Sequence, residues 1–185
     1  MIQDILFALW FFLPAGLANA SPVFANRVPG LSHLGLPLDG GLHFRGKRIF
    51  GDHKTLRGIL VGVLTGIVTC LIQGYIYRHS TWIQSISLID YSSYATCFAL
   101  GLALGFGALA GDAIKSFFKR QFAVPSGKPW FPFDQIDYIV GGLVLSSVVI
   151  DLPHSAYVWI GLVWFLIHPI ATFLAWLVGL KDSPI

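Results

Sequence analysis

The chain has 185 residues, of which 55% are hydrophobic and only 11% are charged, and its formal net charge at pH 7 is +3. A mean hydropathy of +0.72 argues against a soluble domain, although the length alone would suit one. The composition therefore indicates an integral membrane protein.

Long uncharged runs divide the chain into expected membrane helices. A helix needs about 20 mostly apolar residues to cross the hydrocarbon core, and its backbone groups must be satisfied within the helix. The runs predict five spans, over residues 5–26, 59–77, 91–111, 134–151 and 153–180. We therefore expect an all-α polytopic domain over residues 1–185, with its main loops at 27–58 and 112–137.

The fourth expected span has the shortest apolar run. Its uncharged part lies between Asp137 and Asp151, and runs of that length are often re-entrant or buried segments. We count it as a span because the helix can begin near Asp134, with its acidic residues at the membrane surface.

The basic residues predict the orientation of the spans. Of the twelve lysines and arginines, all but Arg78 fall in the two main loops or at the C-terminus. Because cytoplasmic loops are enriched in lysine and arginine, we expect these loops and the C-terminus in the cytoplasm and the N-terminus outside. Five spans agree with termini on opposite sides of the cell membrane.

Glycines recur at every fourth position in the second and third expected spans. In the second span they are Gly58, Gly62, Gly66 and Gly74, with Cys70 between the last two. In the third span they form two pairs, Gly101 with Gly105 and Gly107 with Gly111. Small residues at this spacing let helix backbones approach closely in lipid, so we interpret them as packing positions rather than a lipid groove. Such faces also suit a homodimer.

The second main loop carries the first half of an expected site. If the third helix continues past Gly111, its spacing places Asp112, Lys115, Ser116 and Lys119 on one face, with Arg120 adjacent. This face presents both signs of charge to one side of the membrane, a pattern that a merely solvated loop does not need.

Two further aspartates open the fourth expected span. Asp134 and Asp137 are three residues apart, so they share a helical face with each other. Together with Asp112 they form a set of carboxylates without thiols, which suits a hard ion such as Mg²⁺ whose shell is completed by phosphates and water. Lys115 and Lys128 are expected to attract anionic lipid, and Lys128 is also a candidate nucleotide contact.

The first main loop supplies a second basic cluster, HFRGKRIFGDHKTLRG at residues 43–58. Glycine lets a backbone approach a ligand closely, and lysine and arginine neutralise phosphates. No P-loop pattern is present. The candidate phosphate and nucleotide contacts are Asn26, Lys47, Arg48, Lys54, Thr55, Arg57, Gly58 and Ser116.

These motifs resemble those of a known enzyme family. The run from Ser116 through Lys119 and Arg120, followed by Asp134 and Asp137, is similar to the signature of the CDP-diacylglycerol synthases. The H-G-G element of that signature is missing, however, and a glutamine replaces its arginine. The chain is closer to the archaeal branch, the CDP-archaeol synthases, which share GDxxKSFxKR, WxPFDQxD and FxGKRxFGDxKTxRG, found here at residues 111–120, 130–137 and 44–58.

The resemblance implies an Mg²⁺-dependent cytidylyltransferase. Its substrates would be CTP and 2,3-bis-O-(geranylgeranyl)glycerol 1-phosphate, an isoprenoid glycerol ether lipid, and its products CDP-archaeol and pyrophosphate. We expect Asp112, Asp134, Lys119 and Arg120 to act in catalysis, with Asp112, Asp134 and Asp137 as metal ligands. The active site would face the cytoplasm, with membrane lipids around the protein and no nucleic acid partner.

Other functions fit the sequence less well. A CDP-alcohol phosphotransferase also uses Mg²⁺ and aspartates, but its D-G-x2-A-R signature is absent. A transporter of phosphorylated solutes would need ionisable residues near the middle of the bilayer. A lipid-binding protein without catalysis would not need three aspartates beside the cations.

Overall fold

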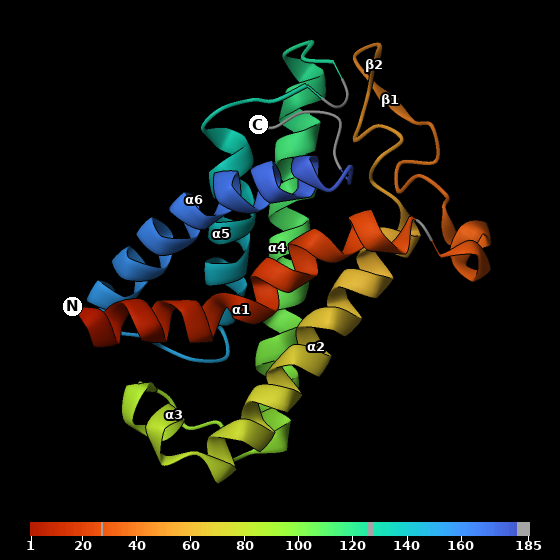
Figure 1. Cartoon of the computed structure of the whole chain (residues 1–185). Helices are drawn as coiled ribbons and strands as arrows, with labels where there is room; N and C mark the ends of the chain where they lie inside the picture. The colour runs from red at the N-terminus through yellow and green to blue at the C-terminus, as the bar shows by residue number, and fades with distance from the viewer. Residues whose placement is uncertain (27, 126–127, 181–185) are drawn as a thin grey trace.

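The computed structural model describes residues 1–26, 28–125 and 128–180, which form a bundle of helices (Figure 1). Arg27 and Lys181, used above to predict orientation, and residues 126–127 of the second loop lie outside the described residues. The helices are α1 (Ile2–Ala25), α2 (Leu56–His79), α3 (Thr81–Ile86), α4 (Tyr94–Gln121), α5 (Phe133–Ser146) and α6 (His154–Leu177). A 3-10 helix η1 (Pro29–Leu34) and a small antiparallel pair, β1 (His43–Phe44) and β2 (Lys47–Arg48), lie between α1 and α2.

The all-helical membrane fold is confirmed, with one difference in the helices that can span. Within the described residues, four helices are long and apolar enough to cross a membrane, namely α1, α2, α4 and α6. The fourth expected span, 134–151, is instead the 14-residue helix α5. At a rise of 1.5 Å per residue it is about 21 Å long, less than the roughly 30 Å of hydrocarbon. The orientation of the chain stays a prediction.

Helix α4 is the central element of the bundle. It lies between α2 and α5, and α1 packs across it (Figure 1). As expected, it does not stop at Gly111 but continues as one helix to Gln121, and so carries Asp112 through Arg120 on regular helical turns. The expected third span, 91–111, therefore continues as far as Gln121 and includes Asp112, Ser116, Lys119 and Arg120 of the expected site.

Glycines set the distance between α4 and its two neighbours, which confirms the packing interpretation. A Cβ added to Gly66 of α2 would lie 2.7 Å from the carbonyl oxygen of Gly101 and 2.9 Å from the Cα of Gly105. On the other side of α4, a Cβ on Gly111 would overlap the main-chain oxygen of Asp137, and one on Gly141 would overlap that of Gly107. Both helix pairs thus touch backbone to backbone.

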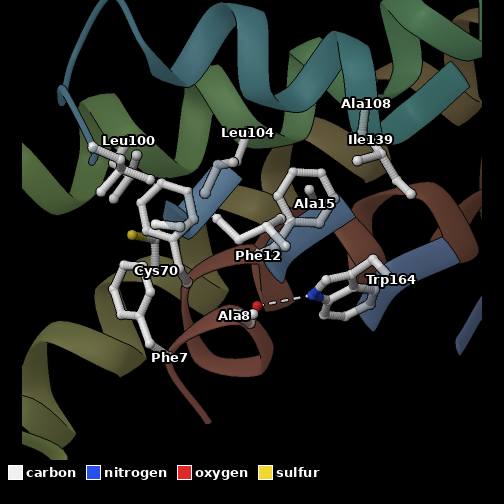
Figure 2. Close-up of a cluster of buried hydrophobic side chains, with 14 of the residues drawn as sticks. Phe7, Ala8, Phe12, Ala15, Cys70, Leu100, Leu104, Ala108, Ile139 and Trp164 are labelled. Atoms are coloured by element: carbon white, nitrogen blue, oxygen red, sulfur yellow. Dashed lines mark hydrogen bonds between the residues drawn. The ribbon is translucent and has the colours of Figure 1, made fainter. Parts of the chain in front are cut away.

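Aromatic side chains fix α1 and α6 against the rest of the bundle. Phe7, Phe11 and Phe12 of α1 are fully buried, and the Trp164 ring of α6 packs against Phe12 (Figure 2). The Trp164 Nε1 donates a hydrogen bond to the Ala8 carbonyl at 2.9 Å, so its polar group is satisfied in the core. These contacts place α6 beside the cleft described below.

The contact between α2 and α4 gives a first prediction. Gly66→Ala should destabilise the protein by about 1–3 kcal/mol, because the new methyl group has no space between the two backbones. Thermal unfolding in detergent measures this effect. The matched control is Gly161→Ala on α6, where an added Cβ meets nothing within 4 Å. Equal unfolding temperatures for the two variants would contradict the packing role of Gly66.

Candidate active site

A cleft of about 580 Å³ lies where α1, α2, α4, α5 and α6 come together. It brings together all the residues expected at the site except Lys47, Arg48 and Arg57. Those in its lining are Asn26, Lys54, Thr55, Gly58, Asp112, Ser116, Lys119, Arg120, Lys128, Asp134 and Asp137. Two loops that are far apart in the sequence therefore contribute to one cleft, as the sequence predicts.

The carboxylates come from two helices held unusually close. Asp112 follows Gly111 on α4, and Asp134 and Asp137 lie in the first two turns of α5. Because Gly111 has no side chain, the main chain of Asp137 packs directly on it. The three carboxylates can therefore reach one common point between the helices.

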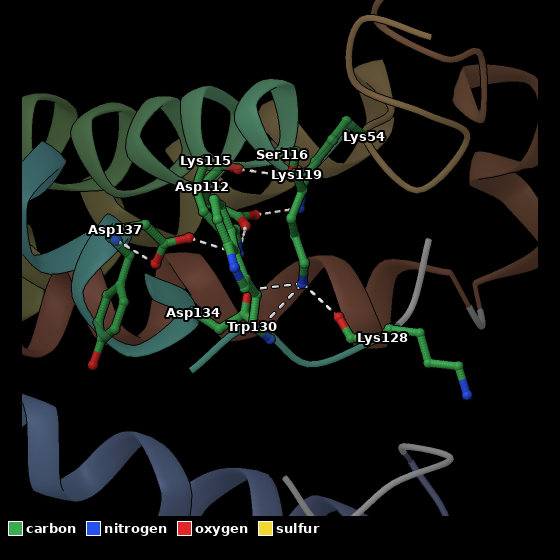
Figure 3. A network of polar contacts seen from close by, with 10 residues as sticks. Lys54, Asp112, Lys115, Ser116, Lys119, Lys128, Trp130, Asp134 and Asp137 are labelled. Atoms are coloured by element: carbon green, nitrogen blue, oxygen red, sulfur yellow. Dashed lines mark hydrogen bonds and ion pairs between the residues drawn. The ribbon is translucent and has the colours of Figure 1, made fainter. Parts of the chain in front are cut away.

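Lys115 occupies that point. Its Nζ lies 3.0 Å from Asp112 Oδ1, 2.7 Å from Asp134 Oδ1 and 2.8 Å from Asp137 Oδ2 (Figure 3). The Lys115 side chain is only 13% exposed. The expectation that Lys115 attracts lipid headgroups does not fit this position, because its ammonium points inward to the carboxylates rather than outward to the membrane surface.

Two other lysines complete the charge network. Lys54, from the start of α2, pairs with Asp112, so the first loop reaches the α4 carboxylate. Lys119 lies 3.0 Å from both oxygens of Asp134 and donates to the Lys128 carbonyl at 2.6 Å. Three aspartates thus face three lysines, and the network as a whole carries no excess charge.

Asp134 also organises the chain that precedes α5. It accepts a hydrogen bond from the Trp130 backbone N–H at 2.5 Å, in addition to its contacts with Lys115 and Lys119. The carbonyl of Lys128 is held by Lys119, while the Lys128 side chain is exposed and extends away from the carboxylates (Figure 3). Asp134 therefore combines a place in the charge network with a structural contact.

The smaller polar residues in the cleft make local contacts. Thr55 is the N-cap of α2, and its Oγ1 accepts from the Gly58 N–H at 3.1 Å. The Ser116 hydroxyl donates to the Asp112 carbonyl at 2.8 Å. Arg120 lines the cleft, and within the described part of the chain its buried Nε has no hydrogen-bond partner. An anionic ligand could use this guanidinium.

Three expected phosphate contacts lie outside the cleft and hold the first loop in place. Lys47 donates to the Gln121 carbonyl at 2.6 Å, beside a separate hollow near Phe44. Arg57 donates to Asn26 Oδ1 at 2.6 Å, which links the loop to the end of α1. Their contacts in this structure are with the protein itself.

Arg48 is engaged by a buried aspartate that the sequence analysis did not single out. Its Nη2 lies 2.7 Å from Asp39 Oδ1, and Asp39 also accepts from the backbone N–H groups of Gly41, Phe50 and Gly51. The Arg48 guanidinium, helped by these N–H groups, holds the pKa of Asp39 well below its usual range despite burial. Asp39 is thus the centre of the loop, and Arg48 has a structural partner.

The cleft also contains residues that sequence reasoning did not select. They are Asn19, Val23, His53, Gln135, His168 and Thr172. His168 packs against the Tyr138 ring at 5.4 Å and also lines the cleft. An ionisable residue within an apolar span is itself a signal of function, and this signal could have identified it.

The cleft offers a divalent metal oxygen donors from three aspartates. No three His, Cys, Asp or Glu side chains among the described residues already form a metal-binding group. Each of the three aspartates nevertheless places an oxygen within 3.0 Å of the Lys115 ammonium, so one position is ringed by anionic oxygens. This chemistry fits a hard cation such as Mg²⁺, at a position that the ammonium now fills.

Comparison with known proteins identifies the family to which the chain is similar. The family model described as CarS-like, CDP-archaeol synthase, matches residues 1–185. The CDP-archaeol synthase of Thermococcus onnurineus is 33% identical over 99% of this chain and 98% of its own length, and that of Methanocaldococcus jannaschii is 34% identical over 98% of each. A solved intramembrane enzyme for archaeal membrane lipid biosynthesis is 28% identical, with a TM-score of 0.72 over 90% of this chain and 93% of that one.

The buried Asp39 gives a prediction about the first loop. Asp39→Asn removes the ion pair with Arg48, so the loop should open more often and trypsin should cut at residues 45–54 roughly tenfold faster or more. The unfolding temperature of the helices should change little. Asp52→Asn is the control, because Asp52 also pairs with Arg48 but is 77% exposed. Equal cleavage rates in the two variants would show that Asp39 does not hold the loop.

Proposed function

The chain belongs to the CDP-archaeol synthase family, and from this premise we propose how its cleft holds two anionic substrates. An enzyme of this family is a CTP-dependent cytidylyltransferase that forms CDP-archaeol. The CDP-alcohol phosphotransferase and transporter alternatives are therefore set aside. The observation that carries the proposal is the convergence of three aspartates, three lysines and Arg120 in one cleft at the end of α4.

The reaction needs positioning more than proton transfer. The lipid substrate, a phosphorylated isoprenoid glycerol ether, carries a phosphate monoester with a second pKa near 6, so its oxygen is largely ionised at neutral pH. This oxygen attacks the α-phosphorus of CTP, a new P–O bond forms, and the bond to the pyrophosphate leaving group breaks. The main obstacle is repulsion between two anions, which fixed cations oppose.

The cations of the cleft take the phosphates. Lys119 and Arg120 are consecutive residues of α4, and Lys54 approaches the same place from the loop just before α2. Lys128, whose side chain is exposed at the cleft, meets the outermost phosphate or an anionic lipid headgroup. Asn26, Thr55, Gly58 and Ser116 supply the weaker contacts to the nucleotide. Lys47, Arg48 and Arg57 act by holding the first loop.

Asp112, Asp134 and Asp137 would hold Mg²⁺, for which their oxygens are suitable donors. When bound, the ion supplies Lewis-acid neutralisation of charge on the phosphates.

We also propose that the cleft faces the cytoplasm, because the basic loops lie on its side of the bundle. The homodimer stays a prediction, and the glycine faces that suggested it are used between α2, α4 and α5 within one chain.

Detergent-solubilised protein should transfer the label of α-labelled CTP into an unsaturated archaeal ether phospholipid acid. Pyrophosphate should be released in equal amount, and EDTA should stop both because the metal site would be empty. ATP, GTP and UTP should replace CTP poorly. Failure of well-folded protein to transfer label from any nucleotide would contradict the proposed function, and transfer in excess EDTA would contradict the metal.

Asp134→Asn tests the carboxylates separately. Loss of one anionic ligand should lower turnover by at least about a hundredfold, since even indirect partners of a metal are worth 10–100-fold. The control is Asp151→Asn, at an exposed aspartate before α6 and outside the cleft. Asp151→Asn should unfold near the wild-type temperature, and turnover of Asp134→Asn is compared at a temperature at which circular dichroism shows it folded, since Asp134 also holds the Trp130 N–H. Wild-type turnover in Asp134→Asn would remove this residue from the metal site.

A further inference from the structure

The position of Lys115 has a consequence for metal binding. One ammonium is shared by three carboxylates at 2.7–3.0 Å, and its side chain is 13% exposed. A divalent metal held by the same three oxygens cannot occupy this position together with the ammonium, because the two cations would overlap and repel each other. Metal binding therefore requires that Lys115 leave.

The charge balance of the network also disfavours metal binding while Lys115 stays beside the carboxylates. Asp112, Asp134 and Asp137 are matched by three ammonium groups, from Lys54, Lys115 and Lys119. Affinity for a hard cation rises with the charge of its ligands. While these ion pairs are made the carboxylates are neutralised, so the site offers a metal ion little net attraction.

An anionic substrate changes that balance. Lys115, Lys119 and Lys54 all line the same cleft, so a triphosphate that enters it meets their ammonium groups. A lysine ammonium is a point charge on a flexible four-carbon stem and can exchange one oxygen partner for another by rotation. Lys115 lies one helical turn after Asp112 and one before Lys119, so its ammonium is close to the other cations of the cleft as well as to the carboxylates.

We propose that Lys115 is a phosphate-binding residue in the loaded enzyme, and that it transfers from the three aspartates to a substrate phosphate when the nucleotide enters. Its departure frees the carboxylate oxygens for the divalent metal. This inference rests on the proposed function of the cleft and adds a residue and an order of events to it. Because binding linkage is reciprocal, metal and nucleotide each strengthen the binding of the other.

The test measures metal binding, not turnover. Full-length protein in detergent, without lipid substrate, is titrated with Mn²⁺, and free Mn²⁺ is followed by electron paramagnetic resonance. Lys115→Gln removes the competing ammonium, so it should bind Mn²⁺ alone about tenfold more tightly or better than wild type, within the 5–150-fold range of typical couplings. Unchanged or weaker binding by folded Lys115→Gln would overturn the proposal.

A matched control separates this effect from a general change in charge. Lys128→Gln removes the same charge from the same cleft, but the Lys128 side chain extends away from the carboxylates (Figure 3). Its Mn²⁺ affinity should stay within about twofold of wild type, since an exposed charge is screened. Equal tightening in Lys128→Gln and Lys115→Gln would overturn the specific role of Lys115.

Wild-type protein provides a test that does not depend on the folding of a variant. Its affinity for Mn²⁺ should rise about tenfold or more when saturating CTP is present, after subtraction of the Mn²⁺ that the same CTP chelates in a titration without protein. Equal affinities with and without CTP would overturn the transfer of Lys115. The labelled-CTP assay keeps the two proposals apart: label transfer with unaltered Mn²⁺ binding in Lys115→Gln sustains the enzyme activity and rejects the Lys115 step alone.

Discussion

The direct backbone contact between α4 and α5 determines where the chemical groups of this protein lie. Gly111 and Gly141 leave no space for a side chain between the two helices, and Asp137 packs its main chain against Gly111. Asp112 and Asp137 can share one cation only because of this contact. In lipid, where burial of apolar surface does not drive helices together, such close packing is a main source of specific association.

A second constraint is that the charged groups lie at the end of membrane-embedded helices. Ionisable side chains there are costly unless they are paired, and Lys115 with its three aspartates is paired on every side. The pairing offsets the cost of burying these charges, because each of the three aspartates has a cation beside it. If the cleft has the proposed function, this charge balance favours ligands that bring phosphates and metal together, since either alone would leave unpaired charge.

The sequence predicted the features that depend on local spacing. Long apolar runs identified four of the membrane helices, and the spacing of Asp112, Ser116 and Lys119 correctly placed them on one face of an extended α4. The length of α5 could not be read in this way, because an apolar run does not show that the helix ends at Ser146. The partners of Lys115 depend on the distance between two helices, which no local pattern contains.

In the first loop, the order of the basic residues along the sequence does not show which of them line the cleft and which hold the loop together. Lys54 reaches Asp112 in the cleft, whereas Arg48, six residues earlier, pairs with the buried Asp39. The main chain connects the segment that carries Asp39 to the segment that carries Lys54, because the Leu38 N–H donates to the Lys54 carbonyl at 2.8 Å. Asp39 therefore fixes the loop on which Lys54 is carried, and its structural contact supports the position of a cation that lines the cleft. Residues that never touch a phosphate can thus determine how well the cleft binds one.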